Sequence, residues 1–157
     1  MIQRIQTVYL SLAVAALAAM FYFPLASFIG GPNDQLIYYM YSVVSKMPDS
    51  TTDLPVYFIY PIFGLAVLTI ILSLTAIFLF KNRMGQLKLV RGGIILILIM
   101  IAVFFFYAAP LLEAASGTIA EYEIGSYMPV LAFVFLILAY RGIMADEKLI
   151  RSADRLR

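Results

Sequence analysis

Residues 56–80 read VYFIYPIFGLAVLTIILSLTAIFLF, without one charged side chain, and Lys81 and Arg83 follow almost at once. A helix that crosses a bilayer needs about 20 mostly apolar residues. Lys and Arg concentrate in loops on the cytoplasmic side of a membrane. This stretch therefore predicts a transmembrane helix that ends at a basic, cytoplasmic loop.

Three further stretches have the same character, at approximately 7–29, 92–112 and 124–140. The last has an unbroken apolar core only from Met128. The chain is 64% hydrophobic and 13% charged, against roughly 45–50% and about 25% in soluble domains. We expect an all-α membrane protein, with residues 1–157 forming one integral membrane domain, a bundle of four transmembrane helices.

The first stretch also has a loose match to a signal-peptide cleavage site, Ala16-Leu17-Ala18. The apolar run continues to Ile29, which is long for a signal core. We therefore expect the first stretch to be retained as a membrane span.

The charged residues divide between two sets of loops. Basic side chains occur before the first stretch, between the second and third, and after the fourth: Arg4; Lys81, Arg83, Lys88 and Arg91; Arg141, Lys148, Arg151, Arg155 and Arg157. The other two loops, 30–55 and 113–123, hold one base, Lys46, and six acids: Asp34, Asp49, Asp53, Glu113, Glu121 and Glu123. We predict that both termini and loop 81–91 are cytoplasmic and that the other two loops are external.

Small residues favour close packing of helices in lipid. Ser11, Ala15 and Ala19 share one helical face, and the second stretch offers Gly64 with the pair Thr69 and Ser73. We predict that both groups form helix–helix contacts, although alanine is also simply common in such helices. Each stretch has one proline near its outer end, which predicts loosened helix ends there: Pro24, Pro61, Pro110 and Pro129. Pro61 and Pro129 also fit a first helical turn, where proline is tolerated.

The first outer loop contains a run rich in aromatic and β-branched residues, 35–44, between a turn at 30–33 and a turn-rich segment at 46–54. This composition favours a strand, and residues 118–124 are a weaker strand candidate. We predict a small antiparallel sheet formed by the two outer loops. The alternative for 35–44 is an interfacial helix with its tyrosines at headgroup depth.

The segment 141–157 is predicted to be a helical cytoplasmic tail. Leu149, Ala153 and Leu156 share one face, and Glu147 and Arg151 have the spacing of a favourable ion pair. Either the fourth span continues into this tail, or Gly142 breaks the helix and the tail lies on the membrane. Its positive charge suits anionic lipid headgroups, although the tail can also serve simply as a stop-transfer anchor.

The sequence has no Cys and no His. This excludes disulfides, thiolate nucleophiles and the commonest metal and haem ligands. The six outer acids could offer oxygen ligands to a divalent cation, but their spacing matches no known metal-binding loop. We expect no catalytic, cofactor-binding or metal-binding residues and no cofactor. The net charge of +2 does not indicate nucleic-acid binding.

Three segments resemble the signatures of one family: residues 1–10 (MIQRIQTVYL), residues 78–83 (FLFKNR), and residues 138–143 (LAYRGI) with 146–149 and 151–157. Together they are similar to the domain of unknown function 4293 family of small bacterial membrane proteins. The resemblance implies four helices and an inner-membrane location. It implies no activity and no catalytic residue.

These observations favour a binding role over catalysis. No Asp, Glu, Lys, Arg or His lies in the interior of any stretch, whereas transporters usually place such groups along their pathway. We expect a non-catalytic accessory or scaffold subunit of a larger assembly in the bacterial cytoplasmic membrane, in contact with the lipid bilayer and with membrane-protein partners. The alternatives are an oligomeric transporter or channel component, and a membrane enzyme with a rim site of outer-loop carboxylates.

Overall fold

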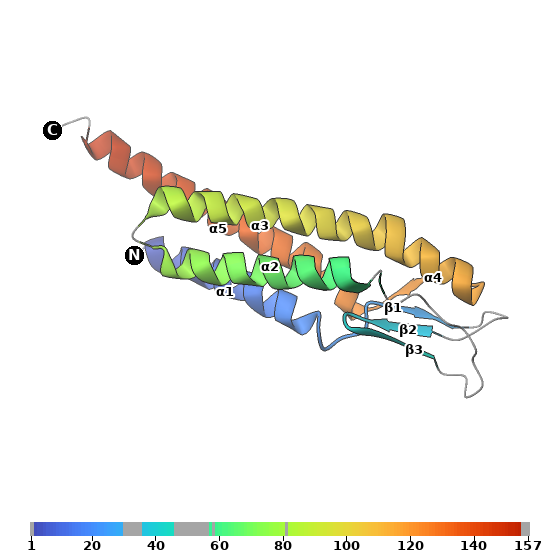
Figure 1. Ribbon diagram of the computed structural model, residues 1–157. Helices are drawn as coiled ribbons and strands as arrows, with labels where there is room; N and C mark the ends of the chain where they lie inside the picture. The colour runs from blue at the N-terminus through green and yellow to red at the C-terminus, as the bar shows by residue number, and fades with distance from the viewer. Residues whose placement is uncertain (1, 30–35, 46–56, 58, 81, 155–157) are drawn as a thin grey trace.

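The computed structural model describes residues 2–29, 36–45, 57, 59–80 and 82–154. Its helices run alongside one another in an elongated bundle, with a small sheet at one end (Figure 1). The start of α1 and the end of α5 lie toward the opposite end (Figure 1). The helices are α1 (Ile2–Ala19), α2 (Ile59–Phe78), α3 (Arg83–Val103), η2 (Phe104–Ala108), α4 (Ala109–Ser116) and α5 (Ile124–Asp154). The strands are β1 (Ala26–Phe28), β2 (Leu36–Tyr39), β3 (Ser42–Ser45) and β4 (Glu121–Tyr122).

The first apolar stretch is not helical throughout, so the expected helix to residue 29 is wrong. Helix α1 ends at Ala19, and residues 26–28 form the buried strand β1. Pro24 stands between them and cannot continue a helical hydrogen-bond ladder. Leu25 N–H instead donates to the carbonyl of Tyr38 at 2.8 Å, which starts the sheet. A fully buried strand has the same apolar composition as a membrane helix, so composition could not separate the two.

The predicted antiparallel sheet is confirmed, and it has four strands in the order β3-β2-β1-β4. The run 35–44 is neither one strand nor an interfacial helix. It contains a hairpin in which Tyr39 pairs with Ser42, so that Met40 and Tyr41 form the connection. The weaker candidate at 118–124 supplies β4, which pairs with β1. The turn predicted at 30–33 and the turn-rich segment at 46–54 lie outside the described residues.

The third helix is longer than predicted. It begins at Arg83 and runs through α3, η2 and α4 to Ser116, 34 residues in all. Most of the predicted cytoplasmic loop 81–91 is therefore the first part of α3. The segment η2 is a π-helical turn in which Ala109 N–H donates to the carbonyl of Phe104, five residues earlier. The next residue, Pro110, has no N–H to donate; the helix has π geometry just before it and then continues to Ser116, so the helix does not end at this proline.

Helix α5 continues without interruption from Ile124 to Asp154, 31 residues. The predicted tail is thus a direct extension of the fourth apolar stretch, and Gly142 does not break the helix. Pro129 lies beyond the first turn, inside the helix. At the N-terminal end, Gly125 N–H donates to the carbonyl of Pro24 at 2.9 Å. A Cβ atom at Gly125 would lie 2.5 Å from that oxygen, so only glycine fits.

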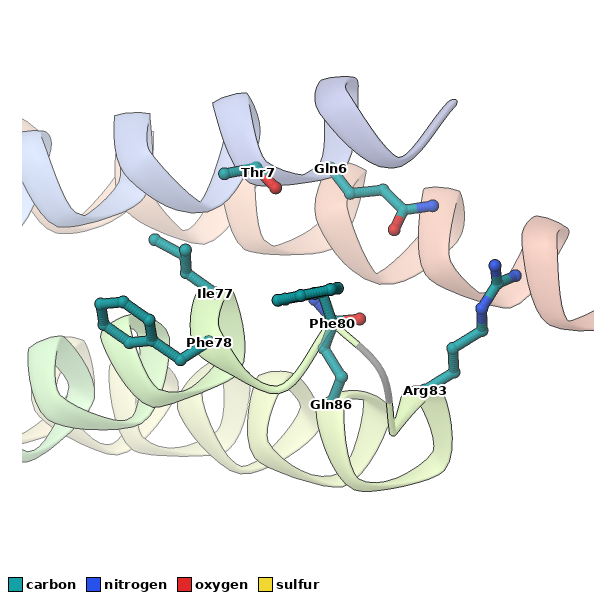
Figure 2. A pocket seen from close by; sticks show the side chains of 7 residues that line it. All are labelled: Gln6, Thr7, Ile77, Phe78, Phe80, Arg83 and Gln86. Carbon is teal, nitrogen blue, oxygen red and sulfur yellow. The ribbon is translucent and has the colours of Figure 1, made fainter. Parts of the chain in front are cut away.

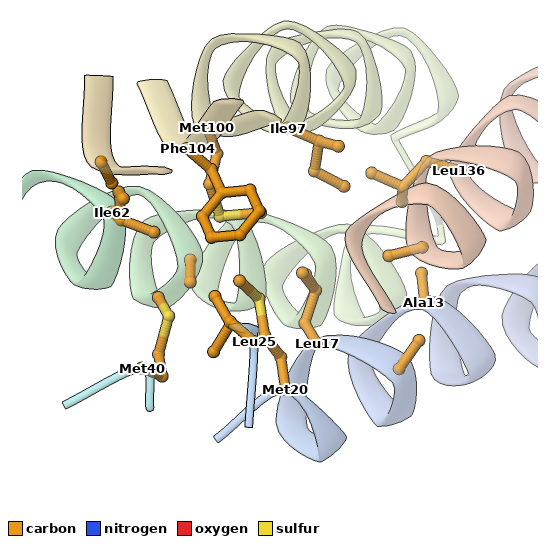
Figure 3. Close-up of a cluster of buried hydrophobic side chains, with 14 of the residues drawn as sticks. Ala13, Leu17, Met20, Leu25, Met40, Ile62, Ile97, Met100, Phe104 and Leu136 are labelled. Carbon is orange, nitrogen blue, oxygen red and sulfur yellow. The ribbon is translucent and has the colours of Figure 1, made fainter. Parts of the chain in front are cut away.

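The core lies along the bundle axis and extends under the sheet. Leu17, Met20, Ile97, Met100 and Leu136 are among its buried members, drawn from α1 and the turn after it, from α3 and from α5 (Figure 3). Alternate residues of β2 are buried, and the ring of Tyr38 stacks on that of Phe104 with centroids 6.1 Å apart. This contact seats the sheet on the π-helical turn.

The two predicted contact faces have different outcomes. Thr69 and Ser73 are buried as expected, and a third small residue, Gly93, packs near the Leu136 side chain. Gly64 is exposed, and a Cβ atom there would meet nothing within 4 Å.

The face of α1 that was predicted to form a contact is also open. Ser11 and Ala15 are exposed, and α1 turns Ala13 and Leu17 toward its neighbours instead. The prediction that Ser11 and Ala15 form a helix–helix contact is therefore wrong within this chain. Alanines occur on both faces of α1, so their spacing could not identify the face that packs against the other helices.

Within the part of the chain that the structure describes, three helical stretches are long and apolar enough to cross a membrane: Ile59–Phe78, Arg83–Ser116 and Ile124–Ile150. The apolar part of α1, Ile5–Ala19, is shorter. Large apolar side chains point outward along the bundle, among them Phe63, Leu68 and Ile71 of α2 and Ile95, Leu98 and Ile99 of α3. Such surfaces are costly in water and indicate a membrane environment.

Candidate binding site at the basic end of the bundle

The end of the bundle opposite the sheet is called here the basic end, because Arg83, Lys88, Arg91, Arg141 and Lys148 lie on the helical segments there. Three parts of the chain meet at this end. They are the first turns of α1, the connection from α2 to α3, and the part of α5 that follows residue 141. Side chains from all three form a polar cluster next to a pocket.

Asp146 is the centre of the polar cluster. Its carboxylate Oδ2 accepts a hydrogen bond from Gln6 Nε2 at 2.6 Å, and Arg83 Nη1 lies 3.9 Å from the same oxygen. Asp146 and Gln6 are each only 5% exposed. Burying a carboxylate is costly unless it is paired and hydrogen-bonded, and these two contacts supply that compensation. They link α5 to α1 and to the start of α3.

The backbone of α5 allows this arrangement. Gly142 lies one turn before Asp146 and therefore on the same face of the helix. A Cβ atom at Gly142 would lie 3.1 Å from Cγ of Gln6, closer than such contacts normally are. The absence of a side chain at Gly142 thus brings α1 close enough for Gln6 to reach Asp146.

The α2–α3 connection is held by two side chains. Gln86 is buried, and its Nε2 donates to the carbonyl of Ala76 at 3.0 Å. This carbonyl belongs to the last turn of α2, where main-chain acceptors lack helical partners. Asn82 caps α3, since its Oδ1 accepts from Gly85 N–H at 3.0 Å. The two bonds fix the position of Arg83 between them.

A pocket of about 470 Å³ opens beside the cluster, between α1 and the α2–α3 connection. Figure 2 shows Thr7 and Gln6 on α1, with Ile77, Phe80 and Gln86 facing them and Arg83 extending toward α5. The remaining lining residue is Phe78. Small-molecule sites in proteins have volumes of about 300–1,000 Å³ and mostly apolar walls with a few polar groups. This pocket has both properties.

The sequence analysis considered the outer acids as possible oxygen ligands. They do not form a cluster in the part of the chain that the structure describes. Glu113 Oε1 accepts from the backbone N–H of Ala120 at 2.9 Å, and Glu123 Oε1 accepts from the Ser27 hydroxyl at 3.0 Å. Glu121 is exposed. Among the described residues no group of three or more acidic side chains could hold a metal ion. Asp34, Asp49 and Asp53 lie outside the described residues.

Two tyrosines of the sheet titrate abnormally. Burial raises the pKa of Tyr38 well above its usual range. The pKa of Tyr122 is raised by burial and by the nearby Glu113 carboxylate. Both shifts favour the neutral phenol, so neither tyrosine is prepared to act as a base or nucleophile.

Sequence reasoning missed the cluster at the basic end. It predicted a helical cytoplasmic tail at 141–157 and assigned no role to Asp146. A polar signal was present, because Gln6 lies one turn from the apolar core residue Leu10 and therefore on the same face of α1. Nothing in the local pattern could connect Gln6 to a residue 140 positions away.

The segments that carry the family resemblance meet at this end of the bundle: residues 1–10 hold Gln6, residues 78–83 hold Arg83, and residues 146–149 hold Asp146. A search of curated proteins found no match. The family model described as a domain of unknown function (DUF4293) matches residues 2–156. This match covers nearly the whole chain, and the protein therefore belongs to the DUF4293 family.

Proposed function

We propose that this protein is a four-span protein of the bacterial cytoplasmic membrane that serves as a non-catalytic accessory or scaffold subunit of a larger membrane assembly. Three candidate spans are supported by helix length and composition. We propose the apolar part of α1, Ile5–Ala19, as the fourth, because the apolar residues 20–23 follow it directly and the two together approach the length of about 20 residues that a span needs.

The charge distribution supports a cytoplasmic basic end and an external sheet. Lys88, Arg91 and Arg141 are exposed near the basic end, whereas Glu121 and Glu123 belong to the sheet end. Lys and Arg near span ends set orientation, and Asp and Glu contribute little. The proposed topology places both chain termini in the cytoplasm.

The hydroxyl groups within the helices support a binding role over transport. The Thr69, Ser73 and Thr75 side chains each donate to a main-chain carbonyl four residues earlier, at distances of 2.7–2.8 Å. These hydroxyl protons are therefore used within α2. Transport pathways in other membrane proteins usually contain ionisable side chains, and the described residues of α2 include no Asp, Glu, Lys, Arg or His.

The proposal of a partner depends on an exposed face of α1. Val8, Ser11, Ala15 and Ala18 are exposed and recur at helical spacing. Small residues permit the close backbone approach on which helix association in lipid depends. Among the described residues no helix of this chain covers this face, and we propose that a transmembrane helix of another subunit packs there.

Purification in mild detergent followed by mass spectrometry tests this role. The wild-type protein is expected to be recovered with a stoichiometric membrane-protein partner. Ala15→Leu should release that partner, because the larger side chain blocks close approach. Ala102→Leu is the matched control, since Ala102 is an exposed alanine on α3. Recovery of the wild-type protein as a monomer, or equal partner yields from both variants, would contradict the proposal.

A separate measurement addresses the transport alternative. Purified protein in liposomes should give no flux of common ions or small solutes above that of empty liposomes. A protein-dependent flux would replace the scaffold role with a transport role.

A further inference from the structure

One wall of the pocket at the basic end is apolar and is partly exposed at the surface of the bundle. Phe78 and Phe80 line it from the end of α2 and the following turn, with exposed fractions of 76% and 50%. Ile77 continues the same wall. The proposed topology places this wall in the headgroup region of the inner leaflet, together with the exposed Lys88 and Arg91 of the neighbouring α3.

The rest of the lining is polar: Gln6 and Thr7 come from α1, and Gln86 and the cation Arg83 come from the start of α3. Arg83 Nη1 is 3.9 Å from Asp146 Oδ2, the limit of an ion pair, whereas Gln6 donates to that oxygen at 2.6 Å. Asp146 is thus bound chiefly to Gln6. The guanidinium has five N–H donors in a planar fork, and one long contact leaves most of them available. The Arg83 side chain is 23% exposed.

We propose that this pocket binds an anionic glycerophospholipid of the inner leaflet. The phosphate group lies against the guanidinium of Arg83, which suits bidentate contact with phosphate oxygens. The first part of one acyl chain lies along Ile77 and Phe78. The inference rests on the proposed membrane topology, and it adds a specific ligand to it.

Two features select a lipid over a soluble phosphate compound. The lining is mostly apolar and is continuous with the outward-facing side of α2, which a soluble anion would leave uncovered. The charge of the surroundings selects an anionic lipid over a zwitterionic one. Lys88, Arg91 and Arg141 lie on helical segments at the same end, and each cation near a membrane surface attracts anionic lipid by about 1 kcal/mol.

Native mass spectrometry of the purified full chain in detergent tests the site. Dioleoyl phosphatidylglycerol and dioleoyl phosphatidylcholine are titrated separately, and bound lipid is counted per protein. We expect one phosphatidylglycerol to bind at least ten-fold more tightly than phosphatidylcholine. Arg83→Gln should weaken phosphatidylglycerol binding by about ten-fold, the effect of losing a charged hydrogen bond. Lys88→Gln, an exposed position on the same helix outside the pocket, removes only a general attraction and should weaken binding by less than about five-fold, clearly less than Arg83→Gln.

Arg83→Gln also removes the contact between Arg83 and Asp146, so a second variant tests the pocket without changing that ion pair. Thr7→Phe fills the pocket without changing any charge and should also release the lipid. Equal binding of the two lipids, or equal losses in Arg83→Gln and Lys88→Gln, would overturn the proposal. Displacement of phosphatidylglycerol by millimolar inorganic phosphate would identify a soluble phosphate ligand and overturn it as well. The measurement uses the purified protein without a partner. Lipid binding can therefore be detected even if the protein proves not to be a scaffold subunit.

Discussion

Gln6 and Asp146 are 140 positions apart in the chain, and a hydrogen bond of 2.6 Å joins their buried side chains. The bond closes the bundle by fastening the first helix to the last. A carboxylate that loses such a partner retains the cost of burial without its compensation. The free energy of unfolding should therefore depend strongly on this pair.

Replacing Asp146 by Ala should lower the free energy of unfolding by about 1.5–3 kcal/mol, the range for hydrogen bonds to charged groups. Thermal unfolding of the purified protein in detergent measures the effect as a loss of several degrees in Tm. Lys148→Ala, an exposed position on the same helix, should change Tm little. In a double-mutant cycle, Gln6→Ala should cost clearly less when Asp146 is already absent. Strictly additive costs would show that the two side chains are not coupled.

Two glycine substitutions should have opposite effects. Gly125→Ala places a Cβ atom 2.5 Å from the carbonyl oxygen of Pro24, and backbone atoms cannot move aside as a flexible side chain can. We expect loss of the folded state in detergent. Gly64→Ala, where a Cβ atom meets nothing within 4 Å, should keep or raise Tm because alanine favours helix by about 1 kcal/mol. Equal tolerance of both changes would mean that residues 23–25 and 125 do not lie in contact.

The buried phenol of Tyr38 makes stability depend on alkaline pH. Its pKa in the folded protein is raised by burial, whereas a tyrosine in the unfolded chain ionises near pH 10. The folded state thus retains the proton longer, so its stability is complete below about pH 10 and falls as the pH rises further. Tyr38→Phe should reduce this loss in unfolding experiments above pH 10. Tyr41→Phe, at an exposed position of the hairpin, should not. The same pH dependence in both variants would contradict the assignment.

The absence of native cysteine allows a clean test of topology. Lys88→Cys and Glu121→Cys place single thiols at exposed positions near the basic end and at the sheet end, respectively. In intact spheroplasts an impermeant maleimide should label residue 121 only, and lysis should make residue 88 reactive. Labelling of both residues before lysis would remove the basis for the four-span arrangement.

Much of the fold could be predicted from apolar length and charge placement. The helices at 59–78 and 124–154 begin within a few residues of the predicted starts, because long apolar runs and turn residues mark such boundaries. The misassigned segment was 20–29, where a buried strand continues the apolar run of a helix. Its identity depends on pairing with residues 36–38 and 121–122, which local composition does not encode.

The hairpin and the candidate site show the same limit. Met40-Tyr41 lacks the Asn-Gly or Asp-Gly signal of a two-residue hairpin connection, so the run appeared to be one strand. Gln6, Arg83 and Asp146 are individually ordinary residues at the ends of apolar stretches. Tertiary packing, including the close approach of α1 at Gly142, brings them together, and the sequence does not encode this contact locally.

The position of β1 in the centre of the sheet has a consequence for biogenesis. One neighbour, β2, comes from the same loop, but the other, β4, precedes the last helix. In the proposed topology β1 and β2 can pair once the first loop has crossed the membrane, whereas β4 arrives only after the third helix has inserted. Until then one edge of β1 is open to wrong pairing with another chain. Its length of three residues limits that hazard, as short edges do in many sheets.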